Sequence, residues 1–499
     1  MSERVAIIDL GSNTSKLILM EYEAGTYYRQ IDELRQVVRL AEGMGTSKVM
    51  RADAFERGLE ALQTFRAYCE AAGVGEVYAT ATSAVREAEN GEAFMTLIKE
   101  QVGLVPELIS GEQEAHYEVT AVVNSMPFED AMMFDIGGGS AELGRIRARA
   151  FDWGESWPLG ALVTTERFFE HDPPKKKEVK ALRAYVAECL EGLDGFAEDL
   201  PFIGMGGTLR NLAKIDQKQA GYPLDLLNGY FLSKDALEDV VETLLDKTVA
   251  EKAELAGLKT DRADIITAGG VVALAALEAS GAAGYTIATQ GLREGVFYGY
   301  LLGKTPLIED LRDFTIRNLA RHYYDFEQHN DHVQMLSLRL YDELQEVHGF
   351  ADAERSLLGA AALIHDIGMA VSYNDHHKHG FYLVLSAELP GFSHREQTII
   401  ALLVRYHRKG TPDDEGLGDV LEDGDMKRVN KLAGILRLAE YLERSKAQRV
   451  TGLECHISGN YVQISVQADE DISVELRETN LRKALFAEAF DVEVDIVNL

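Results

Sequence analysis

The sequence predicts an α/β protein made of two similar halves, followed by a helical region and a small α/β piece. Residues 5–19 and 132–146 share one order of features: an apolar run, an aspartate, a glycine-containing turn with a serine, and a second apolar run. After each of these segments, short strand-like runs alternate with amphipathic helical patterns. From about residue 310 the pattern becomes almost entirely helical.

Each repeated segment is typical of two strands joined by a tight turn. The turn reads Asp9-Leu10-Gly11-Ser12-Asn13-Thr14 in the first copy and Asp135-Ile136-Gly137-Gly138-Gly139-Ser140 in the second. Two homologous halves that begin in this way are expected to face each other across a cleft.

The regions that follow the two repeats supply the remaining elements of the α/β halves. Apolar residues at helical spacing predict the helices, and short apolar runs beside turn residues predict the strands. In the first half we expect helices over 52–72 and 91–102 and strands over 77–81 and 104–109. In the second half we expect a helix over 177–193, strands over 202–205 and 263–267, and an alanine-rich helix after residue 270.

The helical region is rich in histidine. Ten of the thirteen histidines lie between His322 and His407. Beyond it we expect strands over 456–457 and 462–466, a helix over 480–490 and a last strand over 492–497. We predict two α/β domains over 1–125 and 126–305, a helical domain over 306–449 and a small α/β domain over 450–499.

The composition is that of a globular protein, with 46% hydrophobic and 26% charged residues among 499. Its three cysteines are widely spaced and form no zinc-binding or CxxC pattern, which favours a reducing compartment. No apolar stretch is long enough to cross a membrane, and the first residues do not read as a secretion signal. The net charge of −32 argues against nucleic-acid binding, which needs a basic face. We expect a cytoplasmic protein without nucleic-acid or membrane partners.

The glycine-rich turns are candidate anion sites. Without side chains in the way, several backbone N–H groups can converge on one phosphate, and hydroxyl groups add donors. An aspartate at the head of such a turn could hold Mg²⁺ or a water molecule. The alternative is a pair of ordinary hairpins left by a duplication, without a ligand. The candidate phosphate-binding residues are Ser12, Asn13, Thr14, Gly137, Gly138, Gly139, Ser140, Gly207 and Thr208.

Two further charged groups follow predicted strands. The segment Ser110-Gly111-Glu112-Gln113-Glu114 opens a helix, where a carboxylate can project into a cleft and act as a base. The alternative role for its glutamates is to stabilise the start of the helix. Arg86 could clamp a phosphate with its planar guanidinium, or form a surface ion pair.

Several of these segments together resemble the exopolyphosphatase/guanosine pentaphosphate phosphatase (Ppx/GppA) family, within the actin–Hsp70–sugar kinase superfold. The resemblance implies two ribonuclease H-like domains and a C-terminal HD-like domain. The matching segments are 9–13, 81–86, 109–115, 135–143, 206–208 and 404–409.

The resemblance also assigns roles. It selects Glu114 as the general base, and it places Glu142 near the metal or the attacking water. Asp135 and Asp9 would contact Mg²⁺ directly or through water, with K⁺ as an accessory ion. The alternative role of Glu142 is that of a solvent-facing strand residue. The resemblance further suggests a homodimer.

The histidines of the helical region resemble the HD metal phosphohydrolase pattern, in which neutral imidazoles and carboxylates gather a divalent metal. This sequence departs from the HD pattern at Glu440, because HD enzymes carry an aspartate at that position. The alternative is a vestigial, structural domain. His376 and His377 are expected in an exposed loop. The candidate ligands of a second divalent metal are His332, His365, Asp366, His379, His407 and Glu440.

Four functions remain open at this stage. The first is removal of terminal phosphate from inorganic polyphosphate, and the second is hydrolysis at the 5′ end of guanosine pentaphosphate; both could coexist. An ATP-dependent kinase and a nonenzymatic sensor of the same superfold are the others. The basic run over 405–410 is a candidate guide for a phosphate polymer, or a solvated helix end.

Overall fold

The computed structural model describes residues 2–44, 47–193, 196, 200–323 and 327–499. The chain divides into two compact units, one of residues 1–222 with 226–309 and one of 223–225 with 310–499. The finer division into four domains stays a prediction. Within the described residues, every helix is too short or too polar to cross a lipid bilayer.

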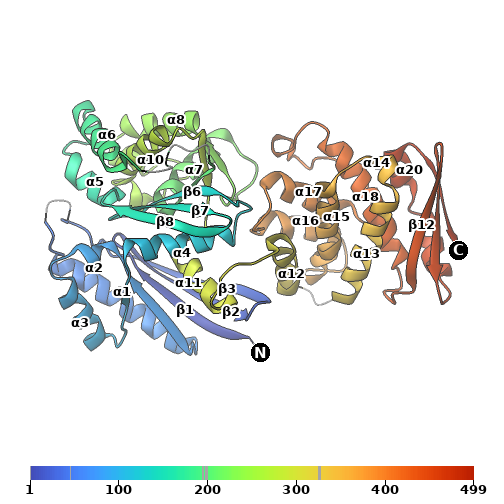
Figure 1. Cartoon of the computed structure of the whole chain (residues 1–499), viewed down its shortest axis with the longest axis horizontal. Coiled ribbons are helices and arrows are strands. Elements are labelled where there is room, and N and C mark those ends of the chain that lie inside the picture. The colour runs from blue at the N-terminus through green and yellow to red at the C-terminus, as the bar shows by residue number, and fades with distance from the viewer. Residues whose placement is uncertain (1, 45–46, 194–195, 197–199, 324–326) are drawn as a thin grey trace. The chain divides into compact units, whose positions relative to one another are not determined.

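The first sheet contains the Asp9 hairpin. Its strand order is β3-β2-β1-β4-β5, in which β1, β2 and β3 are antiparallel neighbours and β4 and β5 continue parallel to β1 (Figure 1). The strand predicted over 104–109 is reduced to two residues. The strands are β1 (Glu3–Leu10), β2 (Thr14–Glu23), β3 (Tyr27–Val37), β4 (Glu76–Ala81) and β5 (Glu107–Leu108).

The second sheet repeats this order around the Asp135 hairpin. The strands run β10-β11-β9-β6-β7-β8, and β8-β7-β6-β9-β11 corresponds strand by strand to the first sheet. The predicted mixed α/β halves are therefore confirmed, and the shared order is consistent with the actin-like superfold. The strands are β6 (Ala131–Ile136), β7 (Ala141–Arg147), β8 (Ala150–Trp157), β9 (Phe202–Met205), β10 (Phe231–Ser233) and β11 (Gly284–Ile287).

Helices cover both sheets of this unit. In Figure 1, α4 lies along β7 and β8, and it also packs against α11. Helix α10 packs against α5, α6, α7 and α8. The helices are α1 (Ala52–Ala71), α2 (Ser83–Glu87), α3 (Gly91–Gln101), α4 (Gly111–Val123), α5 (Ala161–Phe168), α6 (Lys176–Leu190), α7 (Gly206–Ala220), α8 (Lys234–Leu245), α9 (Val249–Lys252), α10 (Ile266–Ser280), α11 (Leu292–Leu302) and the 3₁₀ turn Thr260–Arg262.

The prediction of a strand over 263–267 is wrong, because α10 already begins at Ile266. This helix is buried on nearly every side, so its sequence is apolar throughout and shows no helical period. Gly269 lets it approach α7 closely: a Cβ there would lie 2.5 Å from Cγ2 of Thr208. A fully buried helix and a buried strand look alike in a short apolar run.

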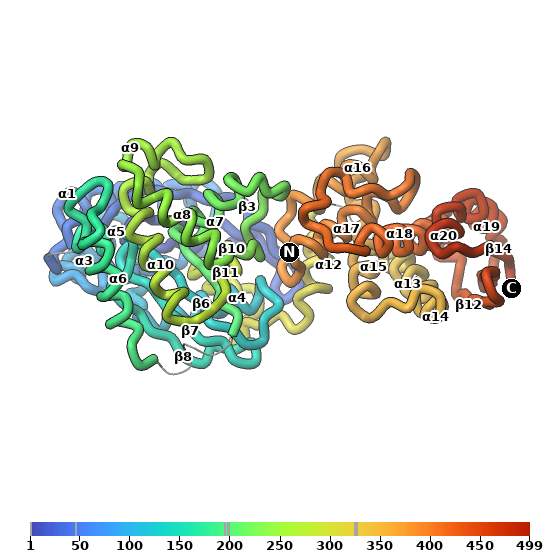
Figure 2. The backbone as a smooth tube through the Cα atoms, turned by 90° about the horizontal axis from the view of Figure 1, so that it is seen from above, coloured from blue at the N-terminus to red at the C-terminus, as the bar shows by residue number. Residues whose placement is uncertain are grey.

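The second unit combines a helical layer with a three-stranded sheet. Figure 2 shows α15, α17 and α18 side by side, and these helices pack against one another. The helix predicted over 480–490 begins later, at Ala484, after a turn that separates it from α19. The elements are α12 (Leu311–Tyr323), α13 (Glu327–Glu343), α14 (Gln345–His348), α15 (Asp352–Ile364), α16 (His376–Ser386), α17 (His394–Tyr406), α18 (Asp425–Leu442), α19 (Ser473–Asn480), α20 (Ala484–Phe490), the 3₁₀ turns Ile367–Ala370 and Gly418–Val420, and the strands β12 (Val450–Ser458), β13 (Tyr461–Ala468) and β14 (Glu493–Asn498).

The two glycine-rich turns touch each other in the first unit. A Cβ on Gly138 would lie 2.6 Å from Cβ of Asn13, and one on Gly139 would lie 2.5 Å from Oγ of Ser12. Glycine is therefore required here for close approach of the two hairpins, since any larger residue would separate them.

We predict that Gly138→Ala lowers the free energy of unfolding by about 1–3 kcal/mol, because the added methyl group overlaps Asn13. Gly75→Ala is the matched control, since nothing lies within 4 Å of a Cβ there. Thermal unfolding of the three proteins measures the difference. Equal stability of Gly138→Ala and the native chain would show that the turns are not in contact.

Candidate functional site

A cavity opens between the two hairpins of the first unit. It has an empty volume of about 770 Å³, part of it open to solvent, and it is lined almost wholly by polar groups and glycines. Both turns contribute, as do the starts of α2, α4, α7 and α11. The sequence-predicted residues that line it are Asp9, Ser12, Asn13, Thr14, Glu114, Asp135, Gly137, Gly138, Gly139, Ser140, Glu142 and Gly207.

The hydroxyl groups at the floor of the cavity are held in place by each other. Oγ of Ser12 lies 2.8 Å from Oγ of Ser83, and it accepts a hydrogen bond of 3.2 Å from the backbone N–H of Ala84. Gly137 closes its own turn with a backbone bond of 3.0 Å to Ser140. The two turns thus present fixed, buried donors to one small volume.

Three glutamates form a buried carboxylate cluster: Glu114 and Glu118 on α4, and Glu142 on β7. One oxygen of each lies within 4.8 Å of the others. A capping box between Ser110 and Gln113 fixes the start of α4, and the spacing of four residues puts Glu114 and Glu118 on one face of it. Such a group of oxygens can hold a divalent cation.

Two neighbours orient the cluster. Oγ of Ser156 donates a hydrogen bond of 2.7 Å to Glu142, and Nη1 of Arg86 lies 3.3 Å from Oε2 of Glu114. Arg86 also donates to the carbonyl of Ile109 at 2.8 Å. Arg86 therefore holds the glutamate rather than lining the cavity, whereas the sequence predicts it as a phosphate ligand.

Burial makes these carboxylates hard to ionise. It raises the pKa of Glu142 to about 7 and that of Asp9 to about 6. Burial, together with repulsion from Glu142, raises the pKa of Glu114 well above its usual range. Burial and repulsion from Asp135 do the same for Glu118. A cation in the cavity would relieve this cost.

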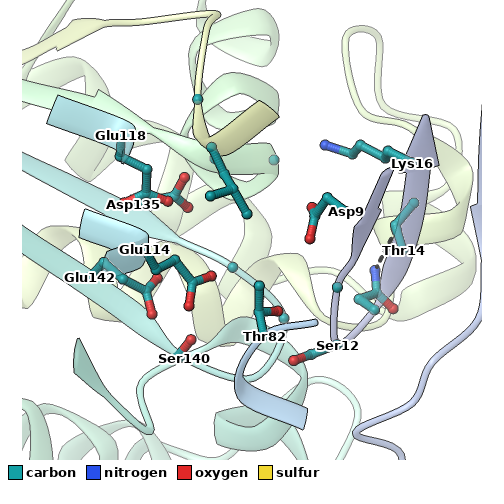
Figure 3. Close-up of a pocket in the computed structure, with 18 of the residues that line it drawn as sticks. Asp9, Ser12, Thr14, Lys16, Thr82, Glu114, Glu118, Asp135, Ser140 and Glu142 are labelled. Atoms are coloured by element: carbon teal, nitrogen blue, oxygen red, sulfur yellow. Dashed lines mark hydrogen bonds between the residues drawn. The ribbon is translucent and has the colours of Figure 1, made fainter. Parts of the chain in front are cut away.

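Basic side chains face the carboxylates across the cavity. Figure 3 shows Glu114, Glu118, Asp135 and Glu142 on one side, with Asp9 and Lys16 on the other. Three arginines complete the basic group. It consists of Lys16, Arg210, Arg262 and Arg293.

Burial of the basic group is also costly. It lowers the pKa of Lys16 to about 7, helped by repulsion from Arg210 and Arg293. Nη1 of Arg262 is buried without a hydrogen-bond partner. A buried guanidinium nitrogen without a partner beside a polar cavity is suited to bind an anion.

The registers of the paired strands show how Lys16 and Glu142 come to lie beside the two aspartates of the hairpins. Lys16 pairs with Asp9 in the first hairpin, and Glu142 pairs with Asp135 in the second. Lys16 and Glu142 thus occupy equivalent positions of the repeat with opposite charge. The alignment of the two repeats already places Lys16 opposite Glu142, but Lys16 was not predicted as a site residue.

Other parts of the site prediction need correction. Thr208 is fully buried, packs beside Gly269 and does not line the cavity, because it points into the helix contact of α7 and α10. Glu118 was missed, although its spacing from Glu114 places both on one helix face. The three arginines were missed because they come from distant segments with no motif of their own.

The second unit brings together four of the six predicted metal ligands: His365, Asp366, His407 and Glu440. Two residues that were not predicted, His329 and His376, join them. Of the remaining two predicted ligands, His332 faces Glu443 at 3.4 Å, and His379 belongs to none of the His/carboxylate groups found among the described residues.

The expectation that His376 and His377 lie in an exposed loop is wrong. They are 4% and 1% exposed. Helix α16 begins at His376 and turns both rings inward. The polar residues before this helix resemble a loop sequence, and the tertiary packing of the helix decides the burial.

Comparison with known proteins agrees with this architecture. The chain matches the Ppx/GppA phosphatase family over residues 19–304 and domain III of the Ppx/GppA phosphatases over 311–486. A Ppx/GppA family member from Aquifex aeolicus is 29% identical, with a TM-score of 0.51 over 60% of this chain and 97% of that one. An exopolyphosphatase from Cytophaga hutchinsonii is 27% identical, with a TM-score of 0.57 over 61% of this chain and 100% of that one.

The two family matches together span most of the chain, and the first of them covers the cavity-lining residues from Thr82 onward, but not those of the Asp9 hairpin. The structural matches show the same kind of fold. The chain therefore belongs to the Ppx/GppA phosphatase family and is a hydrolase that acts on phosphate compounds.

Proposed function

We propose that this protein is an exopolyphosphatase, which hydrolyses the terminal phosphoanhydride of inorganic polyphosphate and releases orthophosphate. The observation that carries the proposal is the cavity itself, which buried glutamates, four basic side chains and two glycine-rich turns line together. The likeness to an exopolyphosphatase from Cytophaga hutchinsonii supports the choice of substrate. Family membership favours hydrolysis over the kinase and sensor alternatives.

The basic group and the two turns bind the terminal phosphate in this proposal. Backbone N–H groups around Gly138 and the hydroxyls of Ser12 and Ser140 surround its oxygens, and Lys16 and Arg262 neutralise its charge. The transferring phosphoryl group carries negative charge throughout the reaction, so fixed donors in a buried site stabilise the transition state.

Glu114 orients the attacking water and accepts its proton. Its carboxylate is buried, lines the cavity and is held by Arg86, which leaves its position well defined. The water attacks the terminal phosphorus in line with the bridging oxygen, the P–O bond to the chain breaks, and orthophosphate leaves.

The donor set fits Mg²⁺, which prefers carboxylate oxygens and water. Oε2 of Glu118 and Oδ1 of Asp9 are buried without hydrogen-bond partners, as expected of atoms that await a cation or its water. The carboxylates of Glu118 and Glu142 would hold the ion, with Asp135 and Asp9 in contact with it directly or through water, and Glu114 would remain the base. When bound, Mg²⁺ neutralises charge on the substrate oxygens. An accessory K⁺ and a homodimer remain proposals on the family resemblance alone, as does the HD-like nature of the helical unit.

A second candidate function is hydrolysis of guanosine pentaphosphate, because the same cavity chemistry suits any terminal phosphoanhydride. Release of orthophosphate from long polyphosphate and from guanosine pentaphosphate, with and without Mg²⁺, separates the two. We expect Mg²⁺-dependent release from polyphosphate at the higher kcat/KM. A preference for guanosine pentaphosphate would support the second candidate, and release from neither would reject both.

We predict that Glu114→Gln lowers kcat for polyphosphate by about 10²–10⁴-fold, because the amide cannot accept the proton of the water. Polyphosphate binding, measured by filter retention, is retained. Glu112→Gln is the matched control, since Glu112 lies in the same helical turn but is exposed. Native turnover in Glu114→Gln would remove this residue from the role of base.

We predict that Glu118→Gln stabilises the metal-free protein at about pH 8. The folded state raises the pKa of Glu118, so it binds the proton more tightly than the unfolded state does. Stability therefore falls as pH rises above the ordinary glutamate range, and Glu118→Gln removes that loss.

Thermal midpoints between about pH 5 and pH 8 measure this effect, with Glu112→Gln as the control that keeps the native slope. The same change should reduce activity, because it removes a cation ligand. A midpoint for Glu118→Gln below the native value at the higher pH would contradict the assigned cost.

A further inference from the structure

Five side chains near helix ends of the second unit form a continuous series of arginine–tyrosine contacts. Tyr373 lies just before α16, and Arg408 follows α17. Tyr441 lies in the last turn of α18, Arg444 comes just after that helix, and Arg482 follows α19. Helix α17 packs against α16 and α18, and α18 packs against α19, so these distant segments meet. We call this group the arginine–tyrosine ladder: Tyr373, Arg408, Tyr441, Arg444 and Arg482.

Each arginine of the ladder contacts a tyrosine ring. Cζ of Arg408 lies 5.5 Å from the centre of the Tyr373 ring. Cζ of Arg444 and Cζ of Arg482 lie 5.9 and 5.2 Å from the centre of the Tyr441 ring. Burial would lower the pKa of Arg444, but hydrogen bonding to Tyr373 raises it above its ordinary value, so Arg444 contacts both tyrosines. The five side chains are therefore linked by cation–π and hydrogen-bond contacts from Arg408 to Arg482.

Two of the three arginines have no carboxylate partner. Among the residues that the structure describes, no aspartate or glutamate oxygen lies within 4.0 Å of the guanidinium of Arg408 or Arg444. The neighbouring Lys409, by contrast, lies 3.2 Å from Asp375. The chain has 82 acidic residues against 50 basic ones, so acidic partners are abundant. Cations that the fold keeps apart from these partners can take an anionic ligand.

Tyr373 gives the ladder an open aromatic surface. This side chain is 55% exposed, although Arg408 approaches its ring. Tyr441 is only 5% exposed, so it supports the arginines from beneath and offers little surface of its own. An exposed ring that is held beside arginines is a platform on which a planar group can stack.

A buried arginine fixes the segment that carries Arg408. Nη2 of Arg437 donates hydrogen bonds of 2.6 Å to the carbonyl of Tyr406 and of 2.8 Å to the carbonyl of Gly410. Arg437 is itself buried. Its bonds hold both ends of the segment 406–410, so that Arg408 is presented in a defined position. A group that is already in place loses less conformational freedom when a ligand binds.

We propose that the arginine–tyrosine ladder binds a free nucleotide, with its base stacked on Tyr373 and its phosphates paired with Arg408 and Arg444. A guanidinium group matches phosphate oxygens with parallel N–H donors, and an aromatic ring stacks on the face of any base. No ladder residue lines the cavity of the first unit, so this site does not rest on the function proposed for that cavity.

The same observations argue against two related ligands. Inorganic polyphosphate has no planar group and would leave the exposed ring of Tyr373 unused. A nucleic acid carries one charge per nucleotide and needs many cations. The ladder offers only two arginines without a described carboxylate partner, in a chain of net charge −32. A nucleoside mono- or diphosphate brings one base and few charges, and it fits this set.

The competing account is a ladder that only joins the helix ends. Cation–π pairs stabilise a fold without any ligand, and the ladder connects segments that follow three different helices. In that account a change at Tyr373 alters stability alone. The two accounts differ in whether nucleotide binding depends on Tyr373.

The test is equilibrium dialysis of radiolabelled ADP and GDP against the full chain at low salt. Because no ladder residue lines the cavity, the difference between the native chain and a ladder variant reports the ladder alone. We expect Tyr373→Ala to weaken binding at this site by about 10-fold, since stacking on the ring is lost, and Tyr373→Phe to retain it. Tyr382→Ala is the matched control and binds as the native chain does, because Tyr382 is 69% exposed on α16 and has no arginine over its ring among the described residues.

Arg444→Gln gives a second readout, because it should weaken ADP binding and leave the ring of Tyr373 in place. Circular dichroism shows whether each variant is folded. Native binding of ADP and GDP by folded Tyr373→Ala and Arg444→Gln would overturn the proposal. So would binding of long polyphosphate that falls in Arg444→Gln while Tyr373→Ala leaves nucleotide binding unchanged, which would indicate a phosphate-only surface. Tighter binding of single-stranded oligoadenylate than of ADP at the ladder would assign the surface to nucleic acid instead.

Discussion

The burial of three neighbouring carboxylates is the constraint on which the first unit depends. Glu114, Glu118 and Glu142 stand within a few ångströms of one another, where water cannot screen their charges. Folding alone would favour apolar residues at these positions. Groups that cost stability in this way are typical of functional sites, so the cluster is the part of the structure most directly tied to the proposed function.

The rest of the unit serves to hold this arrangement. Two sheets of matching strand order bring two hairpins into contact, and glycines at the contact allow backbone to meet backbone. The repeat then differs at one pair of equivalent positions, Lys16 and Glu142, so that a symmetric scaffold carries opposite charges on its two sides. A site that binds both a phosphate chain and its counter-ion needs basic groups for the first and acidic groups for the second.

The sequence predicted those features whose residues are neighbours in the chain, and not those that depend on residues brought together by the fold. The hairpins were predicted because neighbouring residues in the sequence are enough to identify a glycine-rich turn between two apolar runs. Glu114 was predicted because its segment resembles a family pattern. Arg262 could not be found in this way, since only tertiary structure brings it to the cavity. The strand expected over 263–267 and the exposed loop expected at His376 failed for one reason: burial of a helix depends on its neighbours in space.

The protonation state of the carboxylate cluster tests the central claim most directly. Infrared spectroscopy of the metal-free protein detects the C=O stretch of protonated carboxyl groups as pH is raised. We predict that part of this band persists up to about pH 6 to 7, the raised pKa values of Asp9 and Glu142, and that Mg²⁺ removes it by displacing the protons. Loss of the whole band by about pH 5, as for exposed carboxyls, would contradict the account.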